Sequence, residues 1–286
     1  MRASVARSLA RLHTAYLDAV YVHDVEFVAE TRAPRTAGDH RAALGAEAAA
    51  YGLGVGQEAD VCGDGDREVL GAVAELRRLQ EEGVVRRVGI SGTSFPPPCV
   101  QRDDVCAGYP LPTLLRLAIL VRHTPPYRPL DVVLSYSHLN LQNRTLLAFR
   151  AAFEVRAGVK QVLTASPLSM GLLTPNAPAW HPASEEIKEA VGQILEVTEK
   201  PGGESGLPEL ALQYAFEQAR EAGIATVVGL SSLKDVHENA QIWYDVNKQG
   251  LGNNDAWKKR AQDVISVLED GGVLDRAWEN PKFYSG

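Results

Sequence analysis

Cysteine is scarce in this sequence. Only three cysteines occur among 286 residues, Cys62, Cys99 and Cys106, and no two of them have the Cys-x-x-Cys spacing of a zinc site. An odd number without that spacing also argues against a disulfide framework and favours a reducing compartment. We therefore expect no metal site and a cytoplasmic location.

Long apolar runs and an excess of positive charge are also lacking. Apolar stretches such as 117–121 are far too short to span a bilayer, and no apolar segment follows Arg2 that would indicate a secretory signal. The formal net charge of -7 gives no electrostatic basis for binding nucleic acid or an anionic membrane. These absences argue against nucleic acid and membranes as partners.

What the sequence does contain is a repeated unit of helix followed by strand. β-branched and apolar runs predict five strands, and residues at helical spacing between capping and terminating residues predict the helices. Because a helix between consecutive strands is a crossover connection, the strands should pair in parallel. The expected strands are 17–24, 84–91, 131–136, 160–165 and 224–228, and the expected helices are 3–16, 66–83, 111–121, 143–158, 185–198, 207–222, 231–243 and 255–268.

Two architectures fit this alternation, an open doubly wound sheet and a closed (β/α)8 barrel. No Gly-x-Gly-x-x-Gly follows any predicted strand, so the signature of the open dinucleotide-binding fold is missing. Five strands are too few to close an eight-stranded barrel. Both are α/β folds, and the strand count alone leaves the choice open; part of a (β/α)8 TIM barrel is what the family resemblance described below implies. A long loop is expected at about 32–66.

Polar residues stand where several strands end. His23 ends the first predicted strand, and the carboxyl ends of parallel strands are where such folds bind substrates. On spacing alone, a histidine in this place more often closes a strand than acts in catalysis. His138 and His237 lie in polar stretches and are expected to be exposed, and His181 is expected to lie in a loop.

The motifs at the strand ends resemble the aldo-keto reductase family. The most specific is the Ser-Pro-Leu-x-x-Gly-Leu-Leu run of 166–173, and the 131–136 segment is similar to the sugar-dehydrogenase branch, which oxidises L-galactose and D-arabinose. The other matching segments are Tyr21-Val22-His23-Asp24, Val88-Gly89-Ile90-Ser91-Gly92 and Val228-Gly229-Leu230-Ser231-Ser232, the last followed by Glu238-Asn239.

This resemblance implies a single domain over 1–286 whose strands correspond to the fourth to eighth of the family barrel. The first three strands would then lie upstream of Met1, and the chain would be truncated at its N-terminus. Those strands carry the Asp, Tyr and Lys of the family's catalytic tetrad, so only its histidine has a counterpart here, His23. The family's Tyr donates the proton in carbonyl reduction, and Tyr136 is the nearest replacement in this chain, although a packing role is the commoner one for such a residue.

The resemblance also implies a nicotinamide cofactor, NAD or NADP. Asp235 stands where NADP-preferring members carry an Arg, and a carboxylate repels a 2′-phosphate, so NAD is slightly favoured. Backbone N–H groups at the start of the helix near 231 would suit a phosphate. The cofactor-binding residues implied are Ser91, Asn140, Ser166, Leu168, Gly171, Gly229, Ser231, Asp235, Glu238 and Asn239.

The function implied is hydride transfer between NAD(P) and an aldose or related small carbonyl or polyol, impaired by the incomplete tetrad. The alternative is a catalytically inactive remnant that binds a nucleotide or a partner. Incomplete barrels leave strand edges open, so self-association through those edges is expected in either case.

Overall fold

The computed structural model describes residues 1–30, 32–35, 37–92, 111–199, 206–252 and 254–278. The segment 93–110, which contains the predicted proline loop, Cys99 and Cys106, lies outside the described residues. The contacts divide the chain into two compact units. Unit 1 comprises Met1–Thr36, Arg41–Ser135 and Phe149–Val162, and unit 2 comprises Ala37–His40, Tyr136–Ala148 and Leu163–Gly286.

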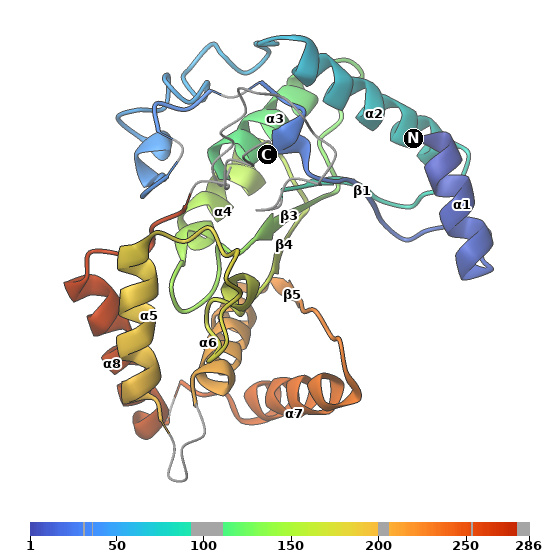
Figure 1. Cartoon of the computed structure of the whole chain (residues 1–286). Coiled ribbons are helices and arrows are strands. Elements are labelled where there is room, and N and C mark those ends of the chain that lie inside the picture. Colours follow the sequence, from blue (N-terminus) through green and yellow to red (C-terminus); the bar gives the residue numbers. More distant parts are fainter. Residues whose placement is uncertain (31, 36, 93–110, 200–205, 253, 279–286) are drawn as a thin grey trace, which may run out of the picture. The chain divides into compact units, whose positions relative to one another are not determined.

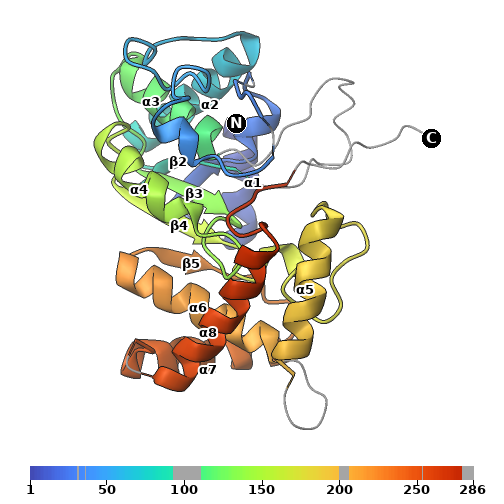
Figure 2. The ribbon, with the colours of Figure 1, turned by 90° about the vertical axis from the view of Figure 1, so that its left-hand side faces the viewer.

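Eight α-helices and five strands alternate along the described chain (Figures 1 and 2). The strands are β1 (Val20–Val22), β2 (Val88–Ser91), β3 (Val132–Tyr136), β4 (Gln161–Ala165) and β5 (Ala225–Val227). The α-helices are α1 (Arg2–Leu12), α2 (Asp64–Glu81), α3 (Leu111–His123), α4 (Thr145–Val155), α5 (Glu185–Val197), α6 (Leu207–Ala222), α7 (Leu233–Gln249) and α8 (Asp255–Asp270), with short 3-10 turns η1 (Val25–Phe27), η2 (Arg41–Leu44) and η3 (Ser169–Gly171).

The sheet confirms the predicted parallel arrangement. Its strands lie in the order β1-β2-β3-β4-β5, the order of the chain. In unit 1, Val22 pairs with Ile90 and Gly89 with Val132, both in parallel register. In unit 2, Leu163 pairs in parallel with Ala225. Sequential parallel neighbours joined by helices are the arrangement of consecutive strands in a (β/α)8 barrel.

Close packing around β2 explains its glycine. All four residues of β2 are buried, and a Cβ on Gly89 would lie 2.4 Å from the Val132 carbonyl oxygen of the neighbouring strand. Only glycine allows the two backbones to approach in this way. Helix α3 is buried on every side over 111–121, which its nearly continuous apolar sequence predicts.

Helix α2 shows one local correction. The sequence predicted Asp66 as its N-cap, but α2 begins at Asp64, and Asp66 lies in the first turn with its carboxylate fully buried. That carboxylate accepts two hydrogen bonds from Arg116, at 2.7 and 2.8 Å, and one from the Cys62 backbone N–H at 2.9 Å. Asp66 therefore ties α2 to α3 inside unit 1, because a buried charge needs a partner of this kind.

The edge strand β1 and its neighbour β2 are both shorter than predicted. β1 spans three residues instead of the expected eight, and β2 spans four. Part of the difference remains as a single parallel bridge between Leu17 and Val85. Between residue 32 and the start of α2 at Asp64, the described residues contain one helical turn, η2.

Helices of unit 2 pack in pairs. Helix α5 lies beside α8, and α6 contacts α7 (Figure 2). Helix α6 has the bounds that the sequence predicted, beginning with Pro208 in its first turn and ending at Gly223 in the left-handed conformation, with φ of 63°.

Candidate functional site

His23 follows β1 at its carboxyl end, in unit 1. Its imidazole is exposed, with 69% of the side chain accessible, and its Nδ1 lies 2.6 Å from the Asp24 carboxylate. The hydrogen bond to Asp24 raises the pKa of His23, although partial burial opposes the shift. The imidazole is therefore biased toward its protonated, hydrogen-bond-donating form.

The sequence analysis missed Asp24 as the partner of His23. Asp24 has a positive φ of 57°, a conformation that Asp and Asn adopt more readily than other non-glycine residues, and it precedes η1. This backbone turn returns the carboxylate toward the ring of the preceding residue. The adjacent His-Asp pair was visible in the sequence, but neighbouring residues in an extended strand would point apart.

Ser91 ends β2 beside His23. Since Val22 pairs with Ile90, the residues that follow them, His23 and Ser91, lie on neighbouring strand ends of the same edge. Ser91 is 1% exposed, and its Oγ has no hydrogen-bond partner among the described residues. A buried hydroxyl without a partner is costly, and it is the kind of group that a ligand amide can satisfy.

Asn140 holds a turn of unit 2. Its amide donates to the Ser137 carbonyl at 3.1 Å and accepts from the backbone N–H groups of Gln142 and Asn143 at 2.9 Å each. The residue is fully buried. The Asn140 side chain therefore forms its hydrogen bonds within the turn after β3. Its role in binding a cofactor stays a prediction.

The segment 166–171, which carries three of the predicted cofactor-binding residues, follows β4 in unit 2 as a tight turn. Ser166 and Gly171 both have positive φ, 62° and 84°, and the Ser166 hydroxyl accepts the Met170 backbone N–H at 2.8 Å. Leu168 packs against the apolar cluster of Leu212, Phe216 and Val246. The three residues are thus brought together in one rigid turn, and the left-handed backbone at 171 suits glycine.

The segment after β5 forms the N-terminus of α7. Ser232 is the N-cap, and Asp235 completes a capping box with it. The Asp235 carboxylate also accepts the Ser231 hydroxyl at 2.7 Å and the Ser231 N–H at 3.0 Å, and these hydrogen bonds lower its pKa. Asp235 therefore places a fixed negative charge at this helix end.

The remaining predicted residues lie on or beside this helix. Gly229 has open space around it, since an added Cβ would meet nothing within 4 Å. Glu238 is exposed and lies 3.6 Å from Lys234. The Asn239 amide donates to the Asp235 carbonyl at 2.8 Å, while its Oδ1 is buried and has no hydrogen-bond partner in the part of the chain that the structure describes.

The predicted site residues thus fall into two groups. His23 and Ser91 lie together in unit 1, and the other nine lie in unit 2, where Ser231, Asp235 and Asn239 are directly linked by hydrogen bonds.

Within the described residues, no group of His, Cys, Asp and Glu side chains is suited to hold a metal ion. None of the described helices combines the length and apolar composition needed to cross a bilayer.

The order of these strand-end residues agrees with a family model. Residues 1–249 match the aldo/keto reductase family. The chain belongs to this family.

Among curated proteins, this aldo/keto reductase family chain is similar to two sugar dehydrogenases. It is 33% identical over 238 residues to D-arabinose 1-dehydrogenase of Saccharomyces cerevisiae, covering 82% of this chain and 55% of that protein. It is 29% identical over 270 residues to L-galactose dehydrogenase of Arabidopsis thaliana, covering 94% of this chain and 64% of that protein. The chain thus spans less than two thirds of the length of either relative.

Two solved structures show a weak likeness to this family member. One is a thermostable aldo-keto reductase in complex with the inhibitor epalrestat, with a TM-score of 0.44 at 14% identity, covering 92% of this chain and 64% of that one. The other is an aldo/keto reductase from Brucella melitensis, with a TM-score of 0.42 at 13% identity, covering 91% and 65%. Likeness at this level carries no argument beyond the family match.

Proposed function

We propose that this chain carries the histidine and the nucleotide-binding part of an NAD(P)-dependent oxidoreductase acting on an aldose or related small carbonyl or polyol. The observation that carries the proposal is the match of residues 1–249 to the aldo/keto reductase family. The similarity to D-arabinose and L-galactose dehydrogenases supports a sugar as the substrate. The scarcity of cysteine supports a cytoplasmic location.

Each unit, taken by itself, carries residues that fit one part of a nicotinamide nucleotide, which when bound would supply or accept the hydride. In unit 1, the unpartnered Ser91 hydroxyl would bind the carboxamide. In unit 2, the 166–171 turn would cover the pyrophosphate, and the N-terminus of α7 with the buried Asn239 Oδ1 would hold the adenosine end. Asn140 and Glu238 would contribute polar contacts.

Asp235 supports a preference for NAD. Its carboxylate is fixed at the α7 N-terminus by Ser231 and Ser232, where the 2′-phosphate of NADP would meet negative charge instead of free N–H groups. Lys234 does not reverse this, because its ammonium group pairs with Glu238. The ribose hydroxyl of NAD carries no charge and would suffer no such repulsion.

His23 would orient the substrate carbonyl. With its pKa raised by Asp24, the imidazole can donate a hydrogen bond to the carbonyl oxygen as negative charge develops there. General acid–base assistance typically contributes ~10²–10⁴-fold, and no tyrosine–lysine pair adjoins His23 among the described residues to provide it. Turnover by this chain alone should therefore be slow, with Tyr136 the first residue to test as a proton donor.

The alternative is a catalytically silent protein that binds the nucleotide or a partner. One observation favours it. Asp24 is the only side chain paired with the His23 imidazole in the part of the chain that the structure describes. Both functions predict NADH binding, so turnover separates them: NADH formation that His23→Ala removes would favour the oxidoreductase, and binding without any such turnover would favour the silent protein.

The test measures both quantities on the same preparation. We expect NADH to quench tryptophan fluorescence more strongly than NADPH at equal concentration. Ser91→Ala should weaken NADH binding about three- to tenfold, the value of one hydrogen bond, and Ser4→Ala on the exposed face of α1 should leave it unchanged. NADH formation with D-arabinose or L-galactose should stay near background, with or without His23→Ala.

Two results would contradict the proposal. Absence of saturable NADH binding would remove the nucleotide-binding role. Turnover at ordinary enzyme rates that His23→Ala abolishes would show that a proton donor is present, and the chain would be a competent enzyme.

A further inference from the structure

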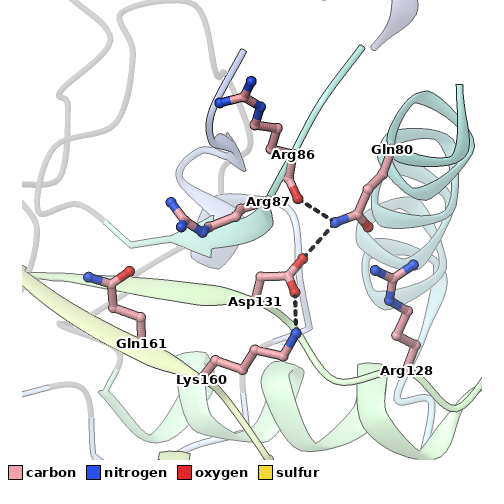
Figure 3. Close-up of a pocket in the computed structure, with 7 residues that line it drawn as sticks. All are labelled: Gln80, Arg86, Arg87, Arg128, Asp131, Lys160 and Gln161. Atoms are coloured by element: carbon pink, nitrogen blue, oxygen red, sulfur yellow. Dashed lines mark hydrogen bonds and ion pairs between the residues drawn. The ribbon is translucent and has the colours of Figure 1, made fainter. Parts of the chain in front are cut away.

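A cavity of about 590 Å³ lies in unit 1 at the amino ends of β2, β3 and β4 (Figure 3). Arg86 and Arg87 precede β2, Arg128 precedes β3 and Lys160 precedes β4. Four of the seven residues that line the cavity are thus cations and one, Asp131, is an acid. This concentration of positive charge is local, because the whole chain has a formal net charge of -7.

Asp131 is already fully engaged. Its Oδ2 accepts hydrogen bonds from Arg77 at 2.8 Å, Gln80 at 3.0 Å and the Val88 N–H at 3.0 Å, and its Oδ1 lies 3.2 Å from the Lys160 ammonium. Burial alone would raise the pKa of Asp131, but these hydrogen bonds outweigh it and hold the pKa at about 2. The single carboxylate therefore stays ionised and cannot neutralise further cations.

Arg87 and Arg128 are the two cations of the cavity whose charge is not neutralised by Asp131 or by Asp18. Both are exposed, and no dashed line reaches either guanidinium in Figure 3. Arg86, by contrast, pairs with Asp18 at 2.8 Å and lies over the Tyr16 ring. Burial lowers the pKa of Arg77, Asp131 opposes that shift, and the charge of Arg128 adds to the lowering, so Arg128 lies close enough to contribute positive charge beside Arg77.

We propose that this cavity binds a small anion that carries more than one phosphate or carboxylate group. A guanidinium presents paired donors that match either group, and two separate guanidiniums favour an anion with two such groups. Lys160 is largely exposed and Gln161 lines the same wall, so both can donate to the ligand. The volume lies within the range of small-molecule sites and is too small for a macromolecular surface.

This site is distinct from the candidate nucleotide site in the same unit. Arg87 and Ser91 lie at opposite ends of β2, four residues apart, which corresponds to roughly 13 Å along a strand. A nucleotide held at Ser91 would therefore lie at the carboxyl end of β2, and an anion held at Arg87 would lie at its amino end. The proposal does not depend on the oxidoreductase function.

Calorimetric titration of the full chain with pyrophosphate and with citrate tests the proposal. The double variant Arg87→Ala/Arg128→Ala should weaken binding at least about tenfold, and Arg128→Gln alone should weaken it by a smaller factor. Arg67→Ala removes the same charge from an exposed position of α2 and should change binding less than about twofold. NADH binding should be the same in the double variant as in the wild type.

Each outcome of these titrations either supports or contradicts the proposed anion site. Tighter binding of pyrophosphate assigns a phosphate ligand and tighter binding of citrate a carboxylate ligand, and both support the site. The proposal fails if neither anion binds at millimolar concentration, if the arginine variants bind as the wild type does, or if only a long polyanion such as heparin binds. If the double variant loses NADH binding as strongly as it loses anion binding, the cavity and the nucleotide site are not separate sites, and this part of the proposal is wrong.

Discussion

The exposed pair of His23 and Asp24 shows how one backbone conformation sets the charge of a side chain. The left-handed φ of Asp24 brings its carboxylate to 2.6 Å from the His23 ring. Because the ring is mostly exposed, solvent and salt screen the interaction, and its contribution to stability is small. Its sign is definite, however, since a raised histidine pKa means that the contribution exists at low pH and is lost as the pH rises through that pKa.

We predict that His23 titrates above its ordinary value of 6.5 in the folded chain. Asp24→Asn should return the midpoint toward 6.5, because the amide keeps the left-handed conformation but carries no charge. The measurement is the pH dependence of the imidazole signals by NMR, with His23→Gln identifying the resonance. A midpoint that Asp24→Asn leaves in place would show that Asp24 does not control this histidine.

Other residues show what the sequence could not reveal. His138 was predicted to be exposed, which is wrong: it is 3% exposed, and burial lowers its pKa to about 3. The segment 137–143 misled the prediction because it folds into a buried turn that is held partly by residues far along the chain. Gln142, for example, donates to the carbonyls of Val273 and Arg276. A local pattern carries no information about such distant partners.

At the scale of elements, α7 depends on its first turn. Most of its residues are exposed, so packing stabilises it less than it stabilises α3 or α6. The capping box supplies hydrogen bonds that packing does not, with the Asp235 N–H donating to the Ser232 hydroxyl at 3.1 Å.

We predict that Ser232→Ala lowers the free energy of unfolding by about 1 kcal/mol, the usual cost of losing an N-cap, and that Ser232→Gly lowers it by only a few tenths. Urea denaturation followed by circular dichroism measures both. Ser266→Ala, within α8, is the matched control and should be neutral or slightly stabilising, because alanine is the better helix former there. Equal losses for the serines of α7 and α8 would contradict a capping role.

Elements with strong local signals were predictable from the sequence. The bounds of α6 follow from Pro208 and Gly223, residues whose backbone preferences need no partner. The outer strands were not predictable to the same degree, since a strand extends only as far as its neighbour pairs with it. The edge strand β1, for example, was predicted over 17–24 but spans only Val20–Val22, where it pairs with β2.

At the scale of the whole molecule, the two edge strands of the sheet, β1 and β5, bear on how the chain associates. In the described sheet, β1 pairs only with β2 and β5 only with β4, as the sequence analysis predicted for the edges of a partial barrel. Apolar side chains accompany the β5 edge in unit 2, where Val227, Leu230 and Leu233 are 48%, 51% and 80% exposed. Unpaired strand edges with apolar neighbours favour association with another chain.

We predict that the purified chain self-associates as its concentration rises and that Val227→Lys reduces this association. A lysine on an edge strand makes edge-to-edge pairing costly, because its charge would have to be desolvated against the incoming strand. Sedimentation velocity over a concentration series measures the distribution of species, with the monomer at 30.9 kDa. Val55→Lys is the matched control, since Val55 is fully exposed in the 32–66 loop of unit 1 and lies on no strand.

A wild-type chain that stays monomeric at every concentration and melts in one sharp transition would show that these edges do not drive association. If both lysine variants reduce association equally, net charge and not the β5 edge would be the cause.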